Sequence, residues 1–244
     1  MLFRSVFPSI GDREVSKLKV GDFAAALGKI WSNRPETSAR VRQRCHDTME
    51  WCQAHGYVIH NPVDRVEFLL PKKPSIAERQ KHFAAMAWKA IPEFLSETLR
   101  KRGNVSRRAL EFLILTAARS GEVRGATWNE IDLDNAIWTI PSDRMKKKRQ
   151  HRIPLSPQAV QILNHQRTHV GHATIVFPSP TGRYLSDMAF TAFLRKHRVP
   201  STEPRRTATA HGFRSSFRDW ASENRFPRDH AERALARSEE HTSE

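Results

Sequence analysis

Apolar residues along the first third of the chain recur at helical spacing. Over residues 36–55 they fall at intervals of three and four, which predicts an amphipathic helix that ends at Gly56. A shorter helix is expected upstream over FAAALGKIW, with Asp22 as its N-cap. These patterns predict a small helical domain over residues 6–72.

The longer second part of the chain also begins with helical patterns. Residues 106–119 carry apolar side chains at i, i+3, i+4, i+7 and i+8, as on a buried helix face. We expect Ser120–Gly121 to end this helix in a tight turn that Gly121 makes possible, with Arg119 at the carboxyl end of the helix. Further helices are expected over residues 92–102, 156–168, 186–197 and 211–223.

Three short apolar runs predict strands instead. Residues 137–140 and 152–155 read as the two strands of a hairpin, and residues 174–177 as a further short strand. We therefore expect a mainly α fold with a small antiparallel β-sheet. The tip of the hairpin is basic, and no acidic residue lies between its five cations. These are Arg144, Lys146, Lys147, Lys148 and Arg149.

A proline- and charge-rich stretch separates the two parts. It contains LPKKPSIAERQK and predicts a linker over residues 73–88, followed by an α+β domain over residues 89–236. The last eight residues, RSEEHTSE, read as a translated sequencing adapter, and LFRS near the start matches the same kind of sequence. We expect residues 1–5 and 237–244 to be adapter-derived and leave them out of the fold prediction.

Charge narrows the choice of partner. The 244 residues include 41 Lys and Arg against 26 Asp and Glu, a formal charge of +15. Basic side chains that neutralise phosphates release counterions, so this surplus favours double-stranded DNA, with an ordinary basic protein as the alternative. No apolar run approaches the ~20 residues of a membrane helix, so no membrane partner is expected. Cys45 and Cys52, ~10 Å apart on one helix, cannot form a disulfide and are expected in the core, which fits a reducing cytoplasm.

The segment HGFRSSFRDWA suggests chemistry. On a helix, His211, Arg214 and Arg218 lie within ~60° of one another, opposite the aromatic residues. Arg can bind a phosphate through two charge-assisted hydrogen bonds, and His can transfer a proton. For this helix, the alternative is an ordinary solvated helix face. For Arg119 it is a surface helix cap, and for the hairpin tip it is a nonspecific basic loop. The histidines lack metal-ligand spacing and no phosphate-loop motif is present, so neither a metal nor a nucleotide cofactor is expected.

Taken in order, the motifs LTAARSGEVRGATWNEIDL, RMKKKRQHRIPLS, VFPSPTGRYLS and HGFRSSFRDWA resemble the tyrosine recombinases, specifically phage and genomic-island integrases of the P4 type. The resemblance implies a helical core-binding domain followed by a catalytic domain, as part of a mobile genetic element. It implies DNA integration by strand cleavage and rejoining through a 3′-phosphotyrosyl intermediate, without metal or nucleotide. The implied partner is the attachment-site core, with tetramer assembly on DNA in the full-length protein.

The resemblance also assigns roles to residues. Arg119 matches the first catalytic arginine, His211 the motif histidine and Arg214 the second arginine. Lys146 matches the hairpin lysine, because it stands eight residues before Pro154; Lys147 and Lys148 are the alternatives.

One part of the family pattern is not found in these residues. The pattern continues after Ala236 with a His or Trp and then the nucleophilic tyrosine, and neither Tyr57 nor Tyr184 is in that place. The resemblance therefore implies a fragment that binds DNA without turnover. A non-enzymatic DNA-binding regulator is the main alternative, and a metal-independent nuclease using His211 and Lys146 is a weaker one.

Overall fold

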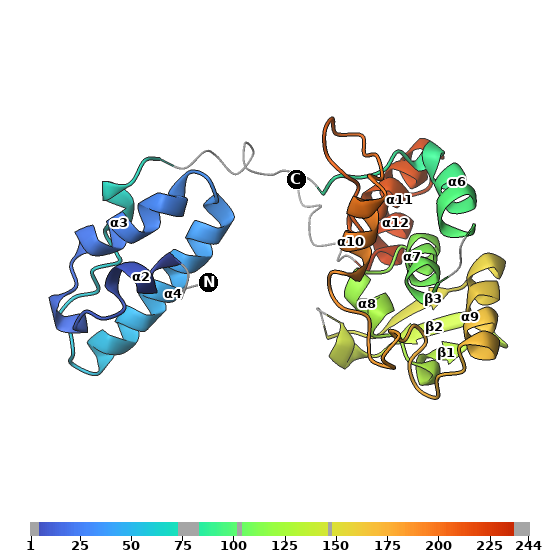
Figure 1. Ribbon diagram of the computed structural model, residues 1–244, viewed down its shortest axis with the longest axis horizontal. Coiled ribbons are helices and arrows are strands. Elements are labelled where there is room, and N and C mark those ends of the chain that lie inside the picture. Colours follow the sequence, from blue (N-terminus) through green and yellow to red (C-terminus); the bar gives the residue numbers. More distant parts are fainter. Residues whose placement is uncertain (1–4, 73–82, 102–103, 146–147, 237–244) are drawn as a thin grey trace. The chain divides into compact units, whose positions relative to one another are not determined.

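The computed structural model describes residues 5–72, 83–101, 104–145 and 148–236 (Figure 1). The chain divides into two compact units, Met1–Lys81 and His82–Glu244. Among the described residues, no helix is both long and apolar enough to span a bilayer.

The first unit is helical. It contains α2 (Phe7–Ile10), α3 (Val20–Trp31) and α4 (Pro35–Ala54), together with two 3-10 turns at Val15–Lys17 and Val66–Leu69. Helices α3 and α4 pack against each other and bury the apolar faces that the sequence predicted. Both cysteines, on α4, are free and buried, as expected, and burial raises the pKa of the Cys45 thiol to about 11.

The predicted N-cap of α3 is wrong. The helix begins at Val20, and Asp22 lies in its first turn, where its carboxylate accepts a hydrogen bond from the Lys19 amide at 2.8 Å. An acid in that position still satisfies an amide at the helix start and faces the positive end of the helix dipole. At the other predicted boundary, Gly56 follows the end of α4 with a φ of +75°, a conformation that glycine adopts readily.

The second unit combines helices with a small sheet. Its first helical segment is a 3-10 turn (Trp88–Ala90), followed by α6 (Ile91–Phe94) and a π-helical turn (Leu95–Leu99). Helix α7 (Val105–Thr116) follows, then α8 (Ser120–Arg124) and a 3-10 turn at Trp128–Glu130. The later helices are α9 (Pro157–His169), α10 (Ala189–Lys196), α11 (Gly212–Glu223) and α12 (Arg228–Ala234).

The sheet has three antiparallel strands in the order β1–β2–β3. The predicted hairpin is confirmed as β2 (Ile137–Ile140) and β3 (His151–Pro154), with a 3-10 turn at Ser142–Arg144 after β2. Strand β1 (Ile131–Asp132) was not predicted. The strand expected over residues 174–177 is wrong, since Ile175 forms only an isolated bridge to Thr127.

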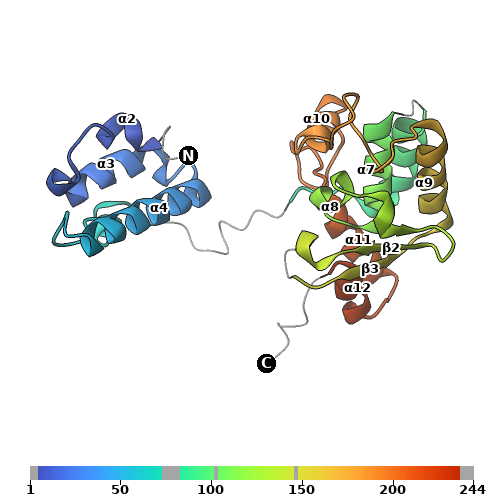
Figure 2. The ribbon, with the colours of Figure 1, turned by 90° about the horizontal axis from the view of Figure 1, so that it is seen from below.

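The core of this unit lies where α7 meets the sheet. Phe112 of α7 contacts the rings of Trp138 and Phe177, with centroids 5.3 and 5.4 Å away, and all three side chains are fully buried. In Figure 2, α7 and α9 lie above β2 and β3, and α12 runs below them. Only one face of the strands is fully buried, because residues of β2 and β3 alternate between buried and half-buried or exposed positions.

The turn after α7 differs from the prediction. Ala117, with a φ of +49°, makes the left-handed turn that ends the helix, and Gly121 instead lies inside the new helix α8. Arg119 is consequently the N-cap residue of α8 and not the last residue of a long helix. The sequence pattern misses this break because residues 117 and 118 are apolar and buried, as they would be in a continuous helix.

Residues 84–86 belong to the second unit, although the sequence placed them in the linker. Ala84, Ala85 and Met86 are buried. The Ala84 carbonyl accepts a hydrogen bond from the Thr209 amide at 2.9 Å, and the Met86 carbonyl accepts one from the Ser216 hydroxyl. This segment therefore packs against α11 and the residues just before it.

Candidate functional site

Arg119 is held in place by a buried acid. Its Nη1 lies 2.6 Å from Oε1 of Glu122, and its backbone amide donates to Oε2 of the same carboxylate at 2.8 Å. A cation at a helix N-terminus is repelled by the helix dipole, so the nearby Glu122 charge offsets that cost. The surface-cap interpretation of Arg119 required a helix C-terminus and is wrong.

A second arginine connects the hairpin to this pair. Arg144 bonds to the buried carboxylate of Glu130, and its Nη2 donates to the Glu122 carbonyl at 2.6 Å. Glu130 also accepts a hydrogen bond from Trp138 Nε1 at 2.9 Å. Arg144 thus fixes the base of the hairpin to α8 and does not belong to a freely solvated tip.

Arg214 lies inside the domain, with only 2% of its surface exposed. Its guanidinium group donates to the carbonyls of Ala117, at the end of α7, and Leu235, after α12. Arg119 donates from Nη2 to the next carbonyl, that of Ala236, at 3.2 Å. Two arginines far apart in sequence therefore meet at the end of α12.

His211 and Arg218 have different surroundings from Arg214. His211 is the N-cap residue of α11, is half-buried, and its ring lies 4.2 Å from the ring of Phe83. Arg214 follows it one turn later, which puts the two side chains on the same helix face. Arg218 is about half exposed, and its Nε lies 3.4 Å from Glu232, so it joins α11 to α12.

Gly212 allows α11 to approach the segment beneath it. A Cβ atom at this position would stand 2.0 Å from the Ala84 carbonyl oxygen. Only glycine fits such a contact, so Gly212 sets the position of the two neighbouring candidate side chains, His211 and Arg214. The sequence did not lead us to expect this role of Gly212. The signal available for it was the His-Gly pair at the start of the helix.

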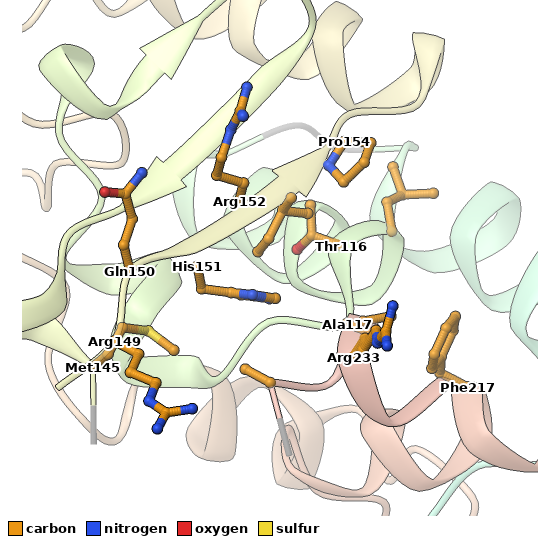
Figure 3. Close-up of a pocket in the computed structure, with 14 residues that line it drawn as sticks. Thr116, Ala117, Met145, Arg149, Gln150, His151, Arg152, Pro154, Phe217 and Arg233 are labelled. Atoms are coloured by element: carbon orange, nitrogen blue, oxygen red, sulfur yellow. The ribbon is translucent and has the colours of Figure 1, made fainter. Parts of the chain in front are cut away.

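An open pocket of about 640 Å³ lies between β3, the end of α7 and the end of α12 (Figure 3). His151, the first residue of β3, points into it, while the neighbouring Arg152 points the other way. Three arginines contribute to its lining, namely Arg149, Arg152 and Arg233. The pocket is therefore basic and suited to an anionic ligand.

The sequence analysis also missed His151. Burial lowers its pKa, and the charges of Arg119 and Arg214 lower it further, whereas Glu122 and a hydrogen bond to the Ala234 carbonyl raise it. These influences place the imidazole within electrostatic reach of both arginines. The signal available in the sequence was its place directly after the basic loop.

The fourth predicted residue, Lys146, lies outside the described residues, as does its alternative Lys147. The other alternative, Lys148, is exposed, with a φ of +54°. Of the four predicted residues, Arg119 and Arg214 therefore meet at the end of α12, and His211 lies one helical turn before Arg214.

One group of side chains has the composition of a metal site. His46 Nε2 lies 3.1 Å from Asp64 and 3.9 Å from Glu50, and the ligand atoms all lie within 4.8 Å of one another. The Glu50 carboxylate also accepts a hydrogen bond from Asn61 at 2.7 Å. The contacts of His46 with the two acids and this hydrogen bond from Asn61 account for the positions of the three side chains.

Comparison with known proteins identifies related sequences. The model of the phage integrase family matches residues 85–243, and that of the phage integrase central domain matches residues 1–67. Prophage integrase IntZ of Escherichia coli is 32% identical over 217 residues, which cover 88% of this chain and 52% of that protein. The integrase of Enterobacteria phage P4 is 29% identical over 251 residues, covering 96% of this chain and 55% of the relative. The chain thus spans about half the length of these relatives.

Solved structures share the fold. A lambda integrase dimer bound to a COC′ core site superposes with a TM-score of 0.71 at 16% identity, covering 98% of this chain and 82% of that one. A lambda integrase tetramer bound to a Holliday junction gives a TM-score of 0.70 at 16% identity, with coverage of 99% and 70%. The predicted fold class, mainly α with a small antiparallel sheet, is confirmed.

Proposed function

The chain belongs to the phage integrase family of tyrosine recombinases, and we propose that it forms the DNA-binding and phosphate-contacting part of a site-specific recombinase. The observation that carries the proposal is the meeting of Arg119 and Arg214. Each guanidinium group donates to one of two successive carbonyls at the end of α12. Two fixed cations at one point are what a phosphodiester in a charge-separated transition state requires.

In this proposal the residues have distinct roles. Arg119 and Arg214 stabilise the charge on the nonbridging oxygens of the phosphate, and His211 receives the proton of the attacking tyrosine hydroxyl. The new bond joins the tyrosine oxygen to phosphorus, and the bond to the 5′-oxygen breaks. Lys146 gives that leaving oxygen its proton. The phosphotyrosyl ester conserves the phosphoester bond, so rejoining needs no cofactor.

We propose double-stranded DNA as the partner, with a tetramer on DNA in the full-length protein. The formal charge of +15 and the arginine-lined pocket support DNA binding. The solved lambda integrase structures are a dimer on a core site and a tetramer on a Holliday junction. The core-binding role falls to residues 6–72 and the catalytic role to residues 89–236.

The chain contains two tyrosines, Tyr57 and Tyr184. Tyr57 lies in the first unit, stacked near Trp51, and Tyr184 is exposed and forms a bridge with Pro178. An oxygen nucleophile must lie in line with the phosphate, and arginines cannot replace it. We therefore propose that these 244 residues bind DNA without cleaving it.

The first test measures binding of a short DNA duplex by fluorescence anisotropy. If this chain makes several phosphate contacts, its affinity should fall by at least about a hundredfold between about 50 and 200 mM salt, because bound counterions are released. No covalent protein–DNA adduct should form. Adduct formation that maps to Tyr57 or Tyr184 would contradict the proposed absence of the nucleophile.

The second test separates binding from chemistry. The chain extended with its natural carboxyl-terminal continuation should trap an adduct on a nicked suicide substrate. Arg119→Ala or Arg214→Ala should then reduce adduct formation by roughly a hundredfold or more, as loss of one charge-stabilising donor does. The exposed Arg195 offers a control, since Arg195→Ala removes the same charge away from these contacts. A stable complex that never cleaves, even when extended, would favour the regulator instead.

A further inference from the structure

Three successive backbone carbonyls at the end of α12 are bound by side chains from three different elements. The Ala236 carbonyl accepts from Arg119 at the start of α8, and the Leu235 carbonyl accepts from Arg214 on α11. The third carbonyl, that of Ala234, is a hydrogen-bond partner of a histidine ring. The carbonyls at a helix C-terminus carry partial negative charge, so this cluster of donors is built to hold negatively charged oxygen atoms.

The histidine is His151. It is the first residue of β3 and pairs with Ile140 across the hairpin, so the sheet holds its backbone. Its ring projects from the strand into the 640 Å³ pocket, on the side where Ala117 and Arg233 lie (Figure 3). It is half-buried, and the neighbouring Arg152 points away from it because successive strand residues face opposite sides.

Charged groups face this ring from every element around it. Glu122 and Arg119 act on it from α8 and Arg214 from α11. On α12, Arg233 lines the same pocket, as does Arg149 from the loop before β3, whereas Arg152 points away from the ring. Burial lowers the pKa of His151 below its ordinary value, and the charges of Arg119 and Arg214 lower it further, against the opposing effects of Glu122 and the Ala234 carbonyl. The ring is therefore neutral near pH 7.

A neutral imidazole has one N–H donor and one acceptor nitrogen, whereas the protonated ring has two donors. If one nitrogen donates to the Ala234 carbonyl, the other can donate to an anion only after the ring gains a proton. A phosphodiester in the pocket supplies the negative charge that favours this gain.

We propose that His151 is a third phosphate-binding residue of this site, which takes up a proton when a DNA phosphate enters the pocket that it lines, within electrostatic reach of Arg119 and Arg214. The proposal rests on the proposed function, because it assigns a further residue to the same DNA site. The proton comes from solvent, and no covalent bond changes. DNA affinity should accordingly rise as the pH falls.

The test is DNA binding by this chain as a function of pH. Anisotropy with a short duplex is measured between about pH 6 and pH 8, the range in which histidines titrate, at constant ionic strength. The parent chain is compared with His151→Gln, which cannot be protonated, and with His230→Gln, which removes an exposed histidine on α12. All three proteins should bind equally, within about twofold, at pH 8, where His151 is neutral.

Acidification should then separate the variants. For the parent and for His230→Gln, affinity should rise by up to about tenfold for each pH unit between the pKa values of the free and bound states. The rise should be smaller in His151→Gln, and the difference is the contribution of His151. Other histidines that contact DNA affect the parent and the variant equally, so they cancel in this comparison.

A second measurement needs no functional variant. The ring resonance of His151, assigned through the backbone resonances of the parent chain, should titrate at a higher pH in the DNA complex than in the free chain. An unchanged titration midpoint overturns the proposal, even if the glutamine variant fails to fold.

Other outcomes have clear meanings. Identical pH profiles for the parent and His151→Gln, with tight salt-sensitive binding in both, overturn the role of His151 and leave the proposed function standing. Weaker binding of the variant by the same factor at every pH shows a structural role alone and also overturns the proposal. Absence of salt-sensitive DNA binding by the parent chain contradicts the proposed function itself.

Discussion

At Gly212 the backbone of α11 passes so close to Ala84 that no side chain fits between them. This contact fixes the start of the helix, and with it the placement of His211 and Arg214. Gly121 was expected to be the conformationally special glycine, but it lies within α8, and the nearest atom to a Cβ there would be 3.9 Å away, on Arg124. A methyl group therefore fits at Gly121 but not at Gly212.

Gly212→Ala should destabilise the second unit by at least about 1–3 kcal/mol, the usual cost of overpacking a buried position. Gly121→Ala is the matched control and should be neutral or stabilising by up to about 1 kcal/mol, since alanine favours a helix interior. Urea denaturation measures both. A loss of stability in Gly121→Ala comparable to that in Gly212→Ala would restore the predicted turn at Gly121.

Acid should destabilise the protein partly through His151. Its pKa is lowered on folding, mainly by burial, so below the unfolded-state value of 6.5 the unfolded chain binds a proton that the folded chain does not. The contribution of His151 to stability is thus complete above pH 6.5 and is lost as the pH falls toward the folded-state pKa. In His151→Gln, the drop in unfolding free energy from about pH 7 to pH 5 should be smaller.

The same change should not abolish acid sensitivity. His165 and His197 also have lowered pKa values, chiefly because of desolvation, and they act in the same direction. His230→Gln, which removes an exposed histidine, serves as the control for the loss of one imidazole. An acid response of His151→Gln equal to that of the parent would show that the ring is not held in its neutral form.

At the scale of elements, the β2–β3 hairpin is fixed to α8 at its base and carries basic side chains in its loop. Arg144 bonds to the buried Glu130 and to the backbone of α8, so it belongs to the attachment. Arg149 is exposed and lines the pocket. Two arginines five positions apart in one sequence motif therefore have different tasks.

Arg144→Ala should cost about 3–5 kcal/mol of unfolding free energy, because it leaves the Glu130 charge buried without its cation. Arg149→Ala should change stability by less than about 0.5 kcal/mol, as surface changes do. It should instead weaken DNA binding and reduce the slope of log affinity against log salt by about one, as expected for one phosphate contact. Equal stability losses in the two variants would contradict this division of roles.

At the scale of the whole molecule, each unit has a core of its own. The described buried apolar residues fall into separate clusters, one with Leu27 and Met49 and the other with Phe112 and Leu163. A cluster that is complete within one unit can unfold without the other. The +15 charge, by contrast, is a property of the whole chain and favours a polyanionic partner.

Thermal unfolding should therefore show two transitions. Leu27→Ala should lower the midpoint temperature of one transition and Leu163→Ala that of the other. Each substitution should reduce the unfolding free energy of its unit by about 2–5 kcal/mol, since both side chains are fully buried. Differential scanning calorimetry resolves the two. A single transition that both substitutions shift by the same amount would show that the units unfold together.

Much of this protein follows from its sequence. Helical periodicity predicts α4 and α9 to within a residue or two, because burial of one face imposes this period locally. Short apolar runs predict β2 and β3. The motif order identifies the family, since the chemistry requires particular residue types at particular spacings. Arg119, Arg214 and His211 could be named as candidates on that ground alone.

Tertiary structure decided the rest. The turn at Ala117, the close approach at Gly212 and the meeting of His151 with the end of α12 all depend on contacts between segments distant in sequence. No local pattern encodes them, because alanine, glycine and histidine have many uses and only the neighbours across the fold select one. The sequence therefore determined which elements form and which chemistry is present, whereas packing decided which side chains share one pocket.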